Sequence, residues 1–465
     1  MLKNIFKKIP KIKGVPISDV KQYFHQRPCS TLEYFCAAPF KSMLFIQNGD
    51  VKVCHYNRGM SIGNYPKMSL IEIWNGAALN RIQDGIKSGD LSQGCFDCRN
   101  FLLKKNYESV PASRYDFLAK FKPEEGYPVM LDFQLTNTCN LECIMCSGEY
   151  SSSIRKNREK GKAYHEPWDN AFIEQLKNFI PHIKAASFTG GEPFASEIYF
   201  SIWNLIKKIN PSIDIFVSTN ATILNDKIKE ILQSLKFNFT ISIDSVVKET
   251  YETIRKNACF ETTMQNISWI ENYCKTNNRS FSIKACIIKN NFQEIPEFIN
   301  FWNDKNCVVY PKLVWFPPYL SIRKLSQDEL KYISNYYENF KFSENTNIQK
   351  GNIRFFKGIC SQINEWTGEN RESPKNKLTF FSTKELKEML IKNISDYINS
   401  HDEIKEKELF YKKEIEEIIC CEKDEVNLKN ALLNFINISP SSIIAEIDRN
   451  TPEKLKERFK AAGKE

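Results

Sequence analysis

From residue 129 onward, short apolar runs rich in β-branched residues alternate with longer segments whose apolar residues recur every three to four positions. The short runs are typical of buried strands, and the longer segments are typical of amphipathic helices. The predicted strands are VMLDFQL (129–135), KAASFT (184–189), IDIFVST (213–219), FTISID (239–244), FSIKACII (281–288) and VVYPKLVWF (308–316). The predicted helices between them are SEIYFSIWNLIKKI (196–209), DKIKEILQSL (226–235), TMQNISWIENYCK (263–275) and EIPEFINFW (294–302).

This alternation of strands and helices predicts an α/β fold with a parallel sheet and right-handed crossovers. Eight strand-and-helix units close a full TIM barrel, so six units predict an open, partial (β/α)6 TIM-like barrel. Composition shifts and turn residues divide the remaining sequence. We expect a basic N-terminal tail (1–25), a small cysteine-rich domain (26–105), a linker (106–128), the barrel (129–320) and a mostly helical C-terminal region (321–465).

Composition and charge narrow the class of protein. The chain has 465 residues, of which 42% are hydrophobic, and its apolar runs are too short and too interrupted to form a membrane span. Lysines at positions 7, 8 and 11 break up the start before a signal peptide can form, so we expect a cytoplasmic protein. The formal charge of +9 is spread along the chain, which argues against a nucleic-acid partner.

The fifteen cysteines are the main chemical signal, because thiols in a reducing compartment more often bind metal or catalyse than form disulfides. After the first predicted barrel strand, TNTCNLECIMCSG places Cys139, Cys143 and Cys146 at CxxxCxxC spacing. Three thiolates are one short of the four that close a structural zinc site, and they suit a [4Fe-4S] cluster with one open iron. One buried face of a helix is the alternative, although the asparagines and glycine of this segment indicate a loop.

Polar residues also stand at the ends of the next three predicted strands. The two glycines of a Gly-Gly-Glu-Pro segment permit a close backbone approach, and its glutamate offers a carboxylate to an ammonium group. Each such residue alone is more often a helix cap or a turn residue. Since successive parallel strands end at one mouth, we expect these residues to share a site. They are Gly190, Gly191, Glu192, Ser218, Asn220, Ser242 and Asp244, with Arg255 one helix further along.

Together these motifs resemble the radical S-adenosylmethionine (SAM) enzymes over about residues 125–320. The resemblance implies that the three loop cysteines hold a [4Fe-4S] cluster whose fourth iron is chelated by the methionyl amine and carboxylate of SAM. It also implies that Glu192 and the Gly190 and Gly191 backbone bind that amine, and that Arg255 pairs with the carboxylate. The backbone of Met145, just before the third cysteine, is expected to contact the adenine. Candidates for the ribose and sulfonium region are Ser218, Asn220, Ser242 and Asp244.

A second cysteine set precedes the barrel and comprises Cys36, Cys54, Cys95 and Cys98. The Asn48-Gly49 turn predicts a hairpin that folds the first two toward each other, and the last two form a CxxC pair. Four thiolates fit a zinc ribbon as well as an iron-sulfur cluster. The order Cys, Gly, Cys, Leu-x-x-Ile-Trp, CxxC resembles the twitch or SPASM domains, which implies one closed auxiliary [4Fe-4S] cluster. Such a unit usually follows the barrel, whereas here it precedes it.

The resemblance implies an enzyme that takes one electron from a flavodoxin or ferredoxin and cleaves SAM to a 5′-deoxyadenosyl radical, which abstracts hydrogen from a substrate carbon. We expect it to mature or oxidise a peptide or protein side chain. The alternatives are a radical SAM dehydrogenase or epimerase acting on a sugar-like metabolite, and a zinc-stabilised nucleic-acid-binding protein. An inward-facing Cys286 could donate a hydrogen atom to a substrate radical, while most other cysteines are expected to pack in the core. No role is assigned to Cys29, Cys360, Cys420 or Cys421.

Overall fold

The computed structural model describes residues 9–27, 34–57, 60–124, 126–368, 381–399, 402–436, 438, 440–449 and 452–463. Cys29 lies outside these residues. The chain forms two compact units. The first runs to Gly368 but leaves out Tyr56–Met60 and Ser92–Phe96, which group with Glu369–Glu465 in the second.

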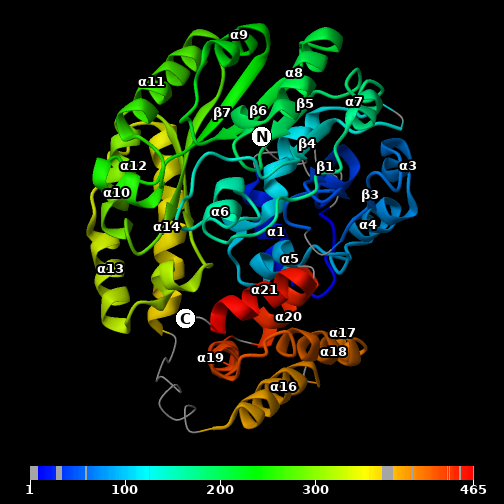
Figure 1. Ribbon diagram of the computed structural model, residues 1–465, viewed down its shortest axis with the longest axis vertical. Helices are drawn as coiled ribbons and strands as arrows, with labels where there is room; N and C mark the ends of the chain where they lie inside the picture. The colour runs from blue at the N-terminus through cyan, green and yellow to red at the C-terminus, as the bar shows by residue number, and fades with distance from the viewer. Residues whose placement is uncertain are drawn as a thin grey trace. The chain divides into compact units, whose positions relative to one another are not determined.

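A nine-stranded sheet in the order β3-β2-β1-β4-β5-β6-β7-β8-β9 is the framework of the first unit (Figure 1). Its last six strands are β4 (Met130–Gln134), β5 (Ala185–Phe188), β6 (Asp214–Thr219), β7 (Lys236–Ser242), β8 (Phe281–Ile287) and β9 (Val308–Leu313). They pair in parallel, each with its neighbour in the sequence. This arrangement confirms the predicted α/β fold with a partial, six-stranded parallel barrel.

Helices cover one face of these strands (Figure 1). They include α8 (Glu197–Ile209), α9 (Asp226–Ser234), α11 (Phe260–Thr276) and α12 (Ile295–Asp304). The connections between the strands also contain α6 (Ser152–Asn157), α7 (Asn170–Leu176) and α10 (Lys248–Ile254). Buried and partly buried side chains alternate along the strands accordingly, since successive side chains point to opposite faces of a sheet. Along β8, for example, Ile283, Ala285 and Ile287 are fully buried. The alternate residues Ser282, Lys284 and Cys286 are only partly buried and give the inner face a polar character.

The cysteine-rich region adds its strands to the same sheet. Strand β1 (Ser42–Ile46) pairs in parallel with β4, with Ser42 opposite Met130. Strands β2 (Asp50–Lys52) and β3 (Gly63–Asn64) extend the sheet in antiparallel fashion. The predicted turn at Asn48-Gly49 joins β1 to β2, and Gly49 has φ 89°, a conformation that suits glycine. The region expected as a separate domain is therefore continuous with the barrel sheet. Its helices are α2 (Ala38–Lys41), α3 (Leu70–Trp74), α4 (Ala77–Ser88) and α5 (Phe96–Leu103).

Two segments expected to be a tail and a linker are packed elements. Within the expected tail, α1 (Ile17–Gln26) buries Val20, Tyr23 and Phe24, because its apolar residues recur at helical spacing. Within the expected linker lie the 3-10 helices η1 (Tyr107–Ser109) and η2 (Pro111–Lys120). The ring of Phe117 in η2 lies 6.0 Å from that of Phe216 on the inner face of β6. Element η2 therefore packs against the inside of the barrel.

The helical C-terminal region is divided between the two units. Helices α13 (Gln327–Asn339) and α14 (Asn347–Gly368) belong to the first unit. In α14, Asn352 accepts a hydrogen bond from Val309 N and donates one to Cys307 O, each at 2.8 Å. Short 3-10 helices complete this unit: η3 (Pro193–Ala195), η4 (Phe292–Glu294), η5 (Pro318–Leu320) and η6 (Ile322–Lys324).

The second unit is a helical bundle of α16 (Thr383–Asn399), α17 (Asp402–Lys405), α18 (Glu408–Ile419), α19 (Glu425–Ile436), α20 (Pro440–Arg449) and α21 (Pro452–Gly463). Its core contains Leu390, Ile394, Tyr411 and Phe459.

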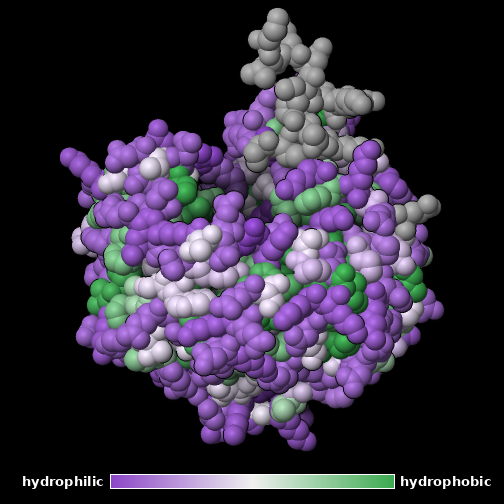
Figure 2. Space-filling model, turned by 90° about the horizontal axis from the view of Figure 1, so that it is seen from above, coloured by the Kyte–Doolittle hydropathy of each residue, from purple (hydrophilic) through white to green (hydrophobic). Residues whose placement is uncertain are grey.

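Within the described ranges, no helix has the length and apolarity needed to cross a membrane. The face in Figure 2 is largely hydrophilic, with apolar residues in small separate groups.

Candidate functional site

The CxxxCxxC segment follows β4 and forms a loop, as its asparagines and glycine predict. Asn137 Nδ2 donates to Gly148 O at 2.8 Å and holds the two ends of the loop together. The Ser153 hydroxyl donates to Cys139 O at 2.7 Å, which fixes the loop to the start of α6. Cys139, Cys143 and Cys146 are each half-buried. The loop therefore presents three thiols at the carboxyl end of the first barrel strand.

The three thiols lie near one another, although not all of them lie within 4.8 Å. Burial, followed by the charges of Cys143 and Cys139, raises the pKa of Cys146 to about 12. Thiolates around one tetrahedral zinc at about 2.3 Å would be about 3.8 Å apart. Among the described residues, however, these three sulfurs do not all lie within 4.8 Å of one another. The wider spacing suits a cluster in which each thiolate binds a different iron.

Arg255 lies against this loop because the backbone after α10 pairs with it. Ile144 N donates to Ile254 O at 2.9 Å, and Glu142 N donates to Lys256 O at 3.1 Å. Burial raises the pKa of the Cys143 thiol to about 11, the Arg255 charge acts to lower it, and Asp244 acts to raise it. The loop thus has one cationic and one anionic side chain beside its second cysteine.

Arg255 and Asp244 form a buried ion pair with each other. Arg255 Nε lies 2.8 Å from Asp244 Oδ2, although the two atoms are not aligned as a hydrogen bond. Burial disfavours the guanidinium charge, but Asp244 and the nearby Cys143 outweigh it and raise the pKa of Arg255. Asp244 also accepts from Cys286 N at 2.7 Å. The sequence predicted both residues at this site but not that each would be the other's partner.

The Gly-Gly-Glu segment runs closely beside the residues that lead into the cysteine loop. Gly191 N donates to Thr136 O at 3.0 Å, and Glu192 N donates to Thr138 O at 2.7 Å. A Cβ atom on Gly191 would lie 2.1 Å from Thr138 O. Gly190 has φ 116°, which side chains rarely tolerate. Both glycines are therefore required for the close approach that the sequence predicts.

The Glu192 carboxylate is buried and hydrogen-bonded to other residues of the chain, whereas the sequence suggested a carboxylate open to a ligand. Glu192 is 1% exposed, and its oxygens accept from Thr219 Oγ1 at 2.6 Å, Asn220 N at 2.7 Å and Phe194 N at 3.2 Å. Burial raises its pKa, while these hydrogen bonds act to lower it. In the structure this side chain joins the end of β5 to the end of β6.

The other predicted residues lie around the same mouth. Asn220 Nδ2 donates to Asn140 Oδ1 at 3.1 Å, which links β6 to the cysteine loop. Ser218 and Ser242 are half-buried on the inner face. Met145 and Cys286 pack, partly buried, against one apolar cluster, which consists of Ile254, Ile288, Val314 and Leu320.

The second cysteine set is more buried. Cys36 and Cys98 are buried, and Cys54 is half-buried. Burial and the nearby Cys54 raise the pKa of Cys36 to about 12. Cys95 is half-buried in the short segment Ser92–Phe96, where Asn57 Nδ2 lies 3.9 Å from its sulfur.

Sequence reasoning missed a contact between a buried aspartate and His55, which follows Cys54 directly. His55 Nε2 lies 2.8 Å from Asp132 Oδ2, and Asp132 stands on the inner face of β4. The other Asp132 oxygen is buried without a hydrogen-bond partner among the described residues. An aspartate within an otherwise apolar predicted strand was the available signal, because an unpaired buried carboxylate is costly.

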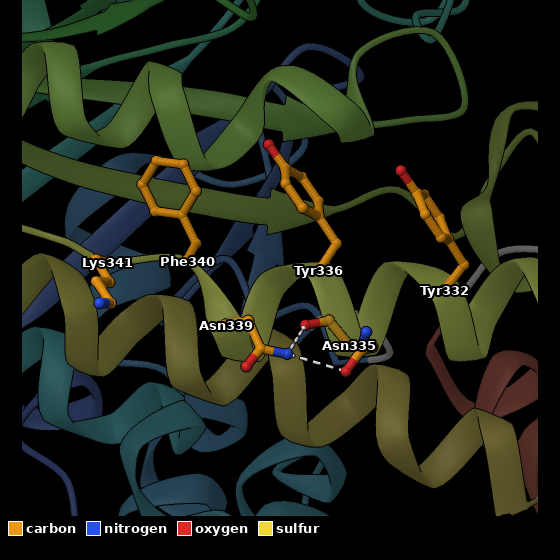
Figure 3. Close-up of a pocket in the computed structure, with 6 residues that line it drawn as sticks. All are labelled: Tyr332, Asn335, Tyr336, Asn339, Phe340 and Lys341. Atoms are coloured by element: carbon orange, nitrogen blue, oxygen red, sulfur yellow. Dashed lines mark hydrogen bonds between the residues drawn. The ribbon is translucent and has the colours of Figure 1, made fainter.

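Two other features lie outside both cysteine sets. In the described part of the chain, the group whose potential metal-binding atoms all lie within 4.8 Å is Glu252, Cys259 and Glu261. A surface pocket of about 380 Å³ is lined by α13 and the residues that follow it (Figure 3). Tyr332, Tyr336 and Phe340 point to one side there. We assign neither feature to the candidate site.

Comparisons with known proteins agree with this geometry. The model of the radical SAM superfamily matches residues 133–301, and that of an iron-sulfur cluster-binding domain, SPASM, matches residues 36–99. An uncharacterized protein of Methanocaldococcus jannaschii is 30% identical over 184 residues, which cover 37% of this chain and 57% of that protein. A GTP 3′,8-cyclase of Clostridium botulinum is 27% identical over 207 residues, with 44% and 61% covered. The chain thus spans about three fifths of the length of these relatives.

Among solved structures, anSMEcpe with bound AdoMet is 22% identical and has a TM-score of 0.35, with 45% of this chain and 60% of that chain covered. SuiB of Streptococcus suis bound to S-adenosylmethionine is 17% identical and has a TM-score of 0.32, with 60% and 65% covered. The family matches coincide with the two cysteine sets found in the structure. The chain therefore contains a radical SAM domain at residues 133–301, preceded at residues 36–99 by an iron-sulfur cluster-binding domain of the SPASM type.

Proposed function

We propose that this chain is an enzyme that cleaves SAM reductively and uses the resulting radical to abstract hydrogen from a carbon of a peptide or protein side chain. The observation that carries the proposal is the set of three neighbouring loop thiols at the carboxyl end of the first strand of a partial parallel barrel, with the Arg255–Asp244 pair beside them. A [4Fe-4S] cluster and SAM are the cofactors of this superfamily, and they supply the electron transfer and the radical chemistry.

Different residues of the barrel mouth would bind the cluster and the methionyl part of SAM. Cys139, Cys143 and Cys146 would bind three irons. The backbone of Gly190 and Gly191 would meet the methionyl amine, since the glycines keep that edge free of side chains. Arg255 would orient the methionyl carboxylate while Asp244 keeps the guanidinium in place.

The adenine and ribose would lie further along the mouth. The apolar cluster that contacts Met145 offers a face for the adenine ring. Ser218, Asn220, Ser242 and Asp244 line the polar side, where ribose hydroxyls need hydrogen bonds. Glu192 would act by positioning the β6 end rather than by contacting the cofactor through its carboxylate, because that carboxylate already accepts three hydrogen bonds.

Cys36, Cys54, Cys95 and Cys98 would hold one auxiliary [4Fe-4S] cluster. Four ligands leave no iron open to a substrate, so this cluster would carry an electron away from the substrate radical. A flavodoxin or ferredoxin would donate the electron that cleaves SAM. We place this auxiliary region at residues 26–105 and the catalytic barrel at residues 129–320. The closed ligand set favours a net oxidation or bond formation.

The substrate would enter the inner face of the barrel. That face carries Ser218, Thr240, Ser282 and Lys284, and hydroxyl and ammonium groups suit the polar backbone and side chains of a peptide. The match to GTP 3′,8-cyclases supports a second candidate, a sugar-bearing small molecule.

The decisive experiment is anaerobic purification followed by iron and sulfide analysis and an assay for 5′-deoxyadenosine after reduction with dithionite. We expect about eight irons per chain and SAM-dependent formation of 5′-deoxyadenosine. A colourless protein that holds zinc would contradict the proposal. Assays against short peptides and against nucleotides would then separate the two substrate classes.

A further inference from the structure

Two lysines stand on the inner face of the barrel, on the neighbouring strands β8 and β9. In the parallel register Lys284 lies opposite Tyr310, and Cys286 lies opposite Lys312. Opposite residues share a face of the sheet, and so do alternate residues along one strand, so both lysines lie on the face that carries Cys286. It is the inner face, because the intervening residues of β8 are buried on the other side. From the spacing of strands and residues, the two lysine Cα atoms are about 8 Å apart.

Cys286 places these lysines at the candidate site. Its backbone N donates to Asp244 Oδ1 at 2.7 Å, and its side chain packs against the same apolar cluster as Met145 of the cysteine loop. Lys312 is level with Cys286, while Lys284 lies two residues, about 6.6 Å, further into the barrel. The two ammonium groups therefore follow the wall from the mouth toward the interior, where a substrate carbon would meet the radical.

This wall of the barrel carries positive charge. The carboxylate beside it, Asp244, is already used by Arg255 Nε at 2.8 Å and by the backbone N of Cys286. Burial, followed by the Asp244 charge, raises the pKa of the Cys286 thiol to about 11. The charges of Lys284 and Lys312 act in the opposite direction. The neighbouring inner-face positions are uncharged and include Ser218, Thr240, Ser242 and Ser282.

Both lysines are accessible from the interior of the barrel. Lys312 is exposed and Lys284 is half-buried. Ammonium groups on long, flexible stems can turn toward one bound group from neighbouring strands, and each has three donors. Hydrogen bonds between an ammonium and a carboxylate are charge-assisted and are stronger than neutral ones. A carboxylate has two oxygens and one charge, which two lysines match, whereas a triphosphate carries several charges.

We propose that Lys284 and Lys312 bind a carboxylate of the substrate, the side chain of an acidic residue near the carbon that loses hydrogen. This inference rests on the proposed function, which brings a peptide into the barrel. The serine and threonine hydroxyls along the same wall would hydrogen-bond the peptide backbone on either side of the acidic residue. The two lysines determine specificity by binding the substrate beside its reacting carbon.

The test compares two synthetic libraries of short peptides with acetylated and amidated ends, randomised at every position except a central glutamate or glutamine. Each library is mixed anaerobically with the iron-loaded protein and SAM at physiological ionic strength, and the retained peptides are separated by gel filtration and quantified by mass spectrometry. We expect the protein to retain the glutamate library about tenfold more than the glutamine library. Lys284→Met and Lys312→Met should each remove most of this preference.

Two control variants separate this site from the general charge of the protein. Lys275→Met removes an exposed lysine of α11 that pairs with Glu271 at 2.7 Å, so the preference for glutamate should remain. Lys284→Arg keeps a positive charge at the same position and should also retain most of the preference.

The outcomes separate this inference from the proposed function. Equal retention of the two libraries, or an unchanged preference in both methionine variants, would overturn the carboxylate site. Retention of GTP in place of either library would also overturn it and would favour the nucleotide class of substrate. Iron content and formation of 5′-deoxyadenosine, measured on the same preparation, test the proposed function independently. If both are absent, the proposed function fails and this inference fails with it.

Discussion

The two cysteine sites of this chain differ in their surroundings. The barrel site presents half-buried thiols at a polar mouth, with the Arg255–Asp244 pair beside them. The N-terminal site buries Cys36 and Cys98, and the arginine of the Arg27–Asp116 pair donates to Phe35 O, next to Cys36. Each site therefore has a buried arginine with its own carboxylate, but all three thiols of the first are half-buried, whereas two of the four thiols of the second are buried.

The largest expected effect comes from removing the open site. Replacing Cys139, Cys143 and Cys146 together by alanine should abolish formation of 5′-deoxyadenosine and remove about half of the iron, because the cluster loses all three ligands. Product analysis by chromatography and iron analysis check this. Cys420→Ala is the control, since that thiol is exposed and outside both sites. Persistent cleavage in the triple variant would refute the catalytic assignment.

Removing the auxiliary cluster should separate SAM cleavage from modification of the substrate. Changing Cys95 and Cys98 to alanine should remove the other half of the iron and abolish modification of the substrate, while reductive cleavage of SAM continues at a reduced rate. Metals often act as staples in small domains, so circular dichroism must show that the variant is folded. A folded variant that still modifies substrate would favour a structural role for this cluster.

The two buried ion pairs allow a direct comparison. Arg255→Met and Arg27→Met should each lower the free energy of unfolding by about 3–5 kcal/mol, because each leaves a buried carboxylate unpaired. Only Arg255→Met should also weaken SAM binding, by about tenfold or more. Urea denaturation and equilibrium binding of SAM measure the two effects. Equal SAM affinities in the two variants would place Arg255 outside the cofactor site.

The smallest expected effect tests how Glu192 acts. Thr219→Val removes the hydroxyl that donates to Glu192 at 2.6 Å and should weaken SAM binding about two- to tenfold, as expected for one lost hydrogen bond. Iron content should stay unchanged. If Glu192→Gln weakens binding strongly and Thr219→Val has no effect, the carboxylate contacts the cofactor directly and the positioning role is wrong.

Local patterns predicted much of this molecule. The strands β4 to β9 and the cysteine loop follow from periodicity and spacing within short segments. The pairing of β1 with β4 could not be predicted, because a strand's own pattern does not specify its neighbour. The hydrogen bonds of Glu192 could not be predicted either, because two of its donors, Thr219 and Asn220, lie at the end of another strand. The burial of α1 was obscured by its lysine-rich surroundings, so the packing of Tyr23 against Phe35 emerged only from the fold.

Asn352 pairs with the backbone at one edge of the open barrel. A partial barrel has two sheet edges, and unpaired edge strands attract other chains. At the β9 edge, the Asn352 side-chain amide accepts a hydrogen bond from Val309 N and donates one to Cys307 O. A neighbouring strand would make the same kinds of hydrogen bond. At the other edge, β4 is shielded by the β1 to β3 extension, and the last strand there has only two residues. A fragment that begins at Val129 would leave the β4 edge unpaired, so the N-terminal region completes the barrel sheet as well as supplying cysteines.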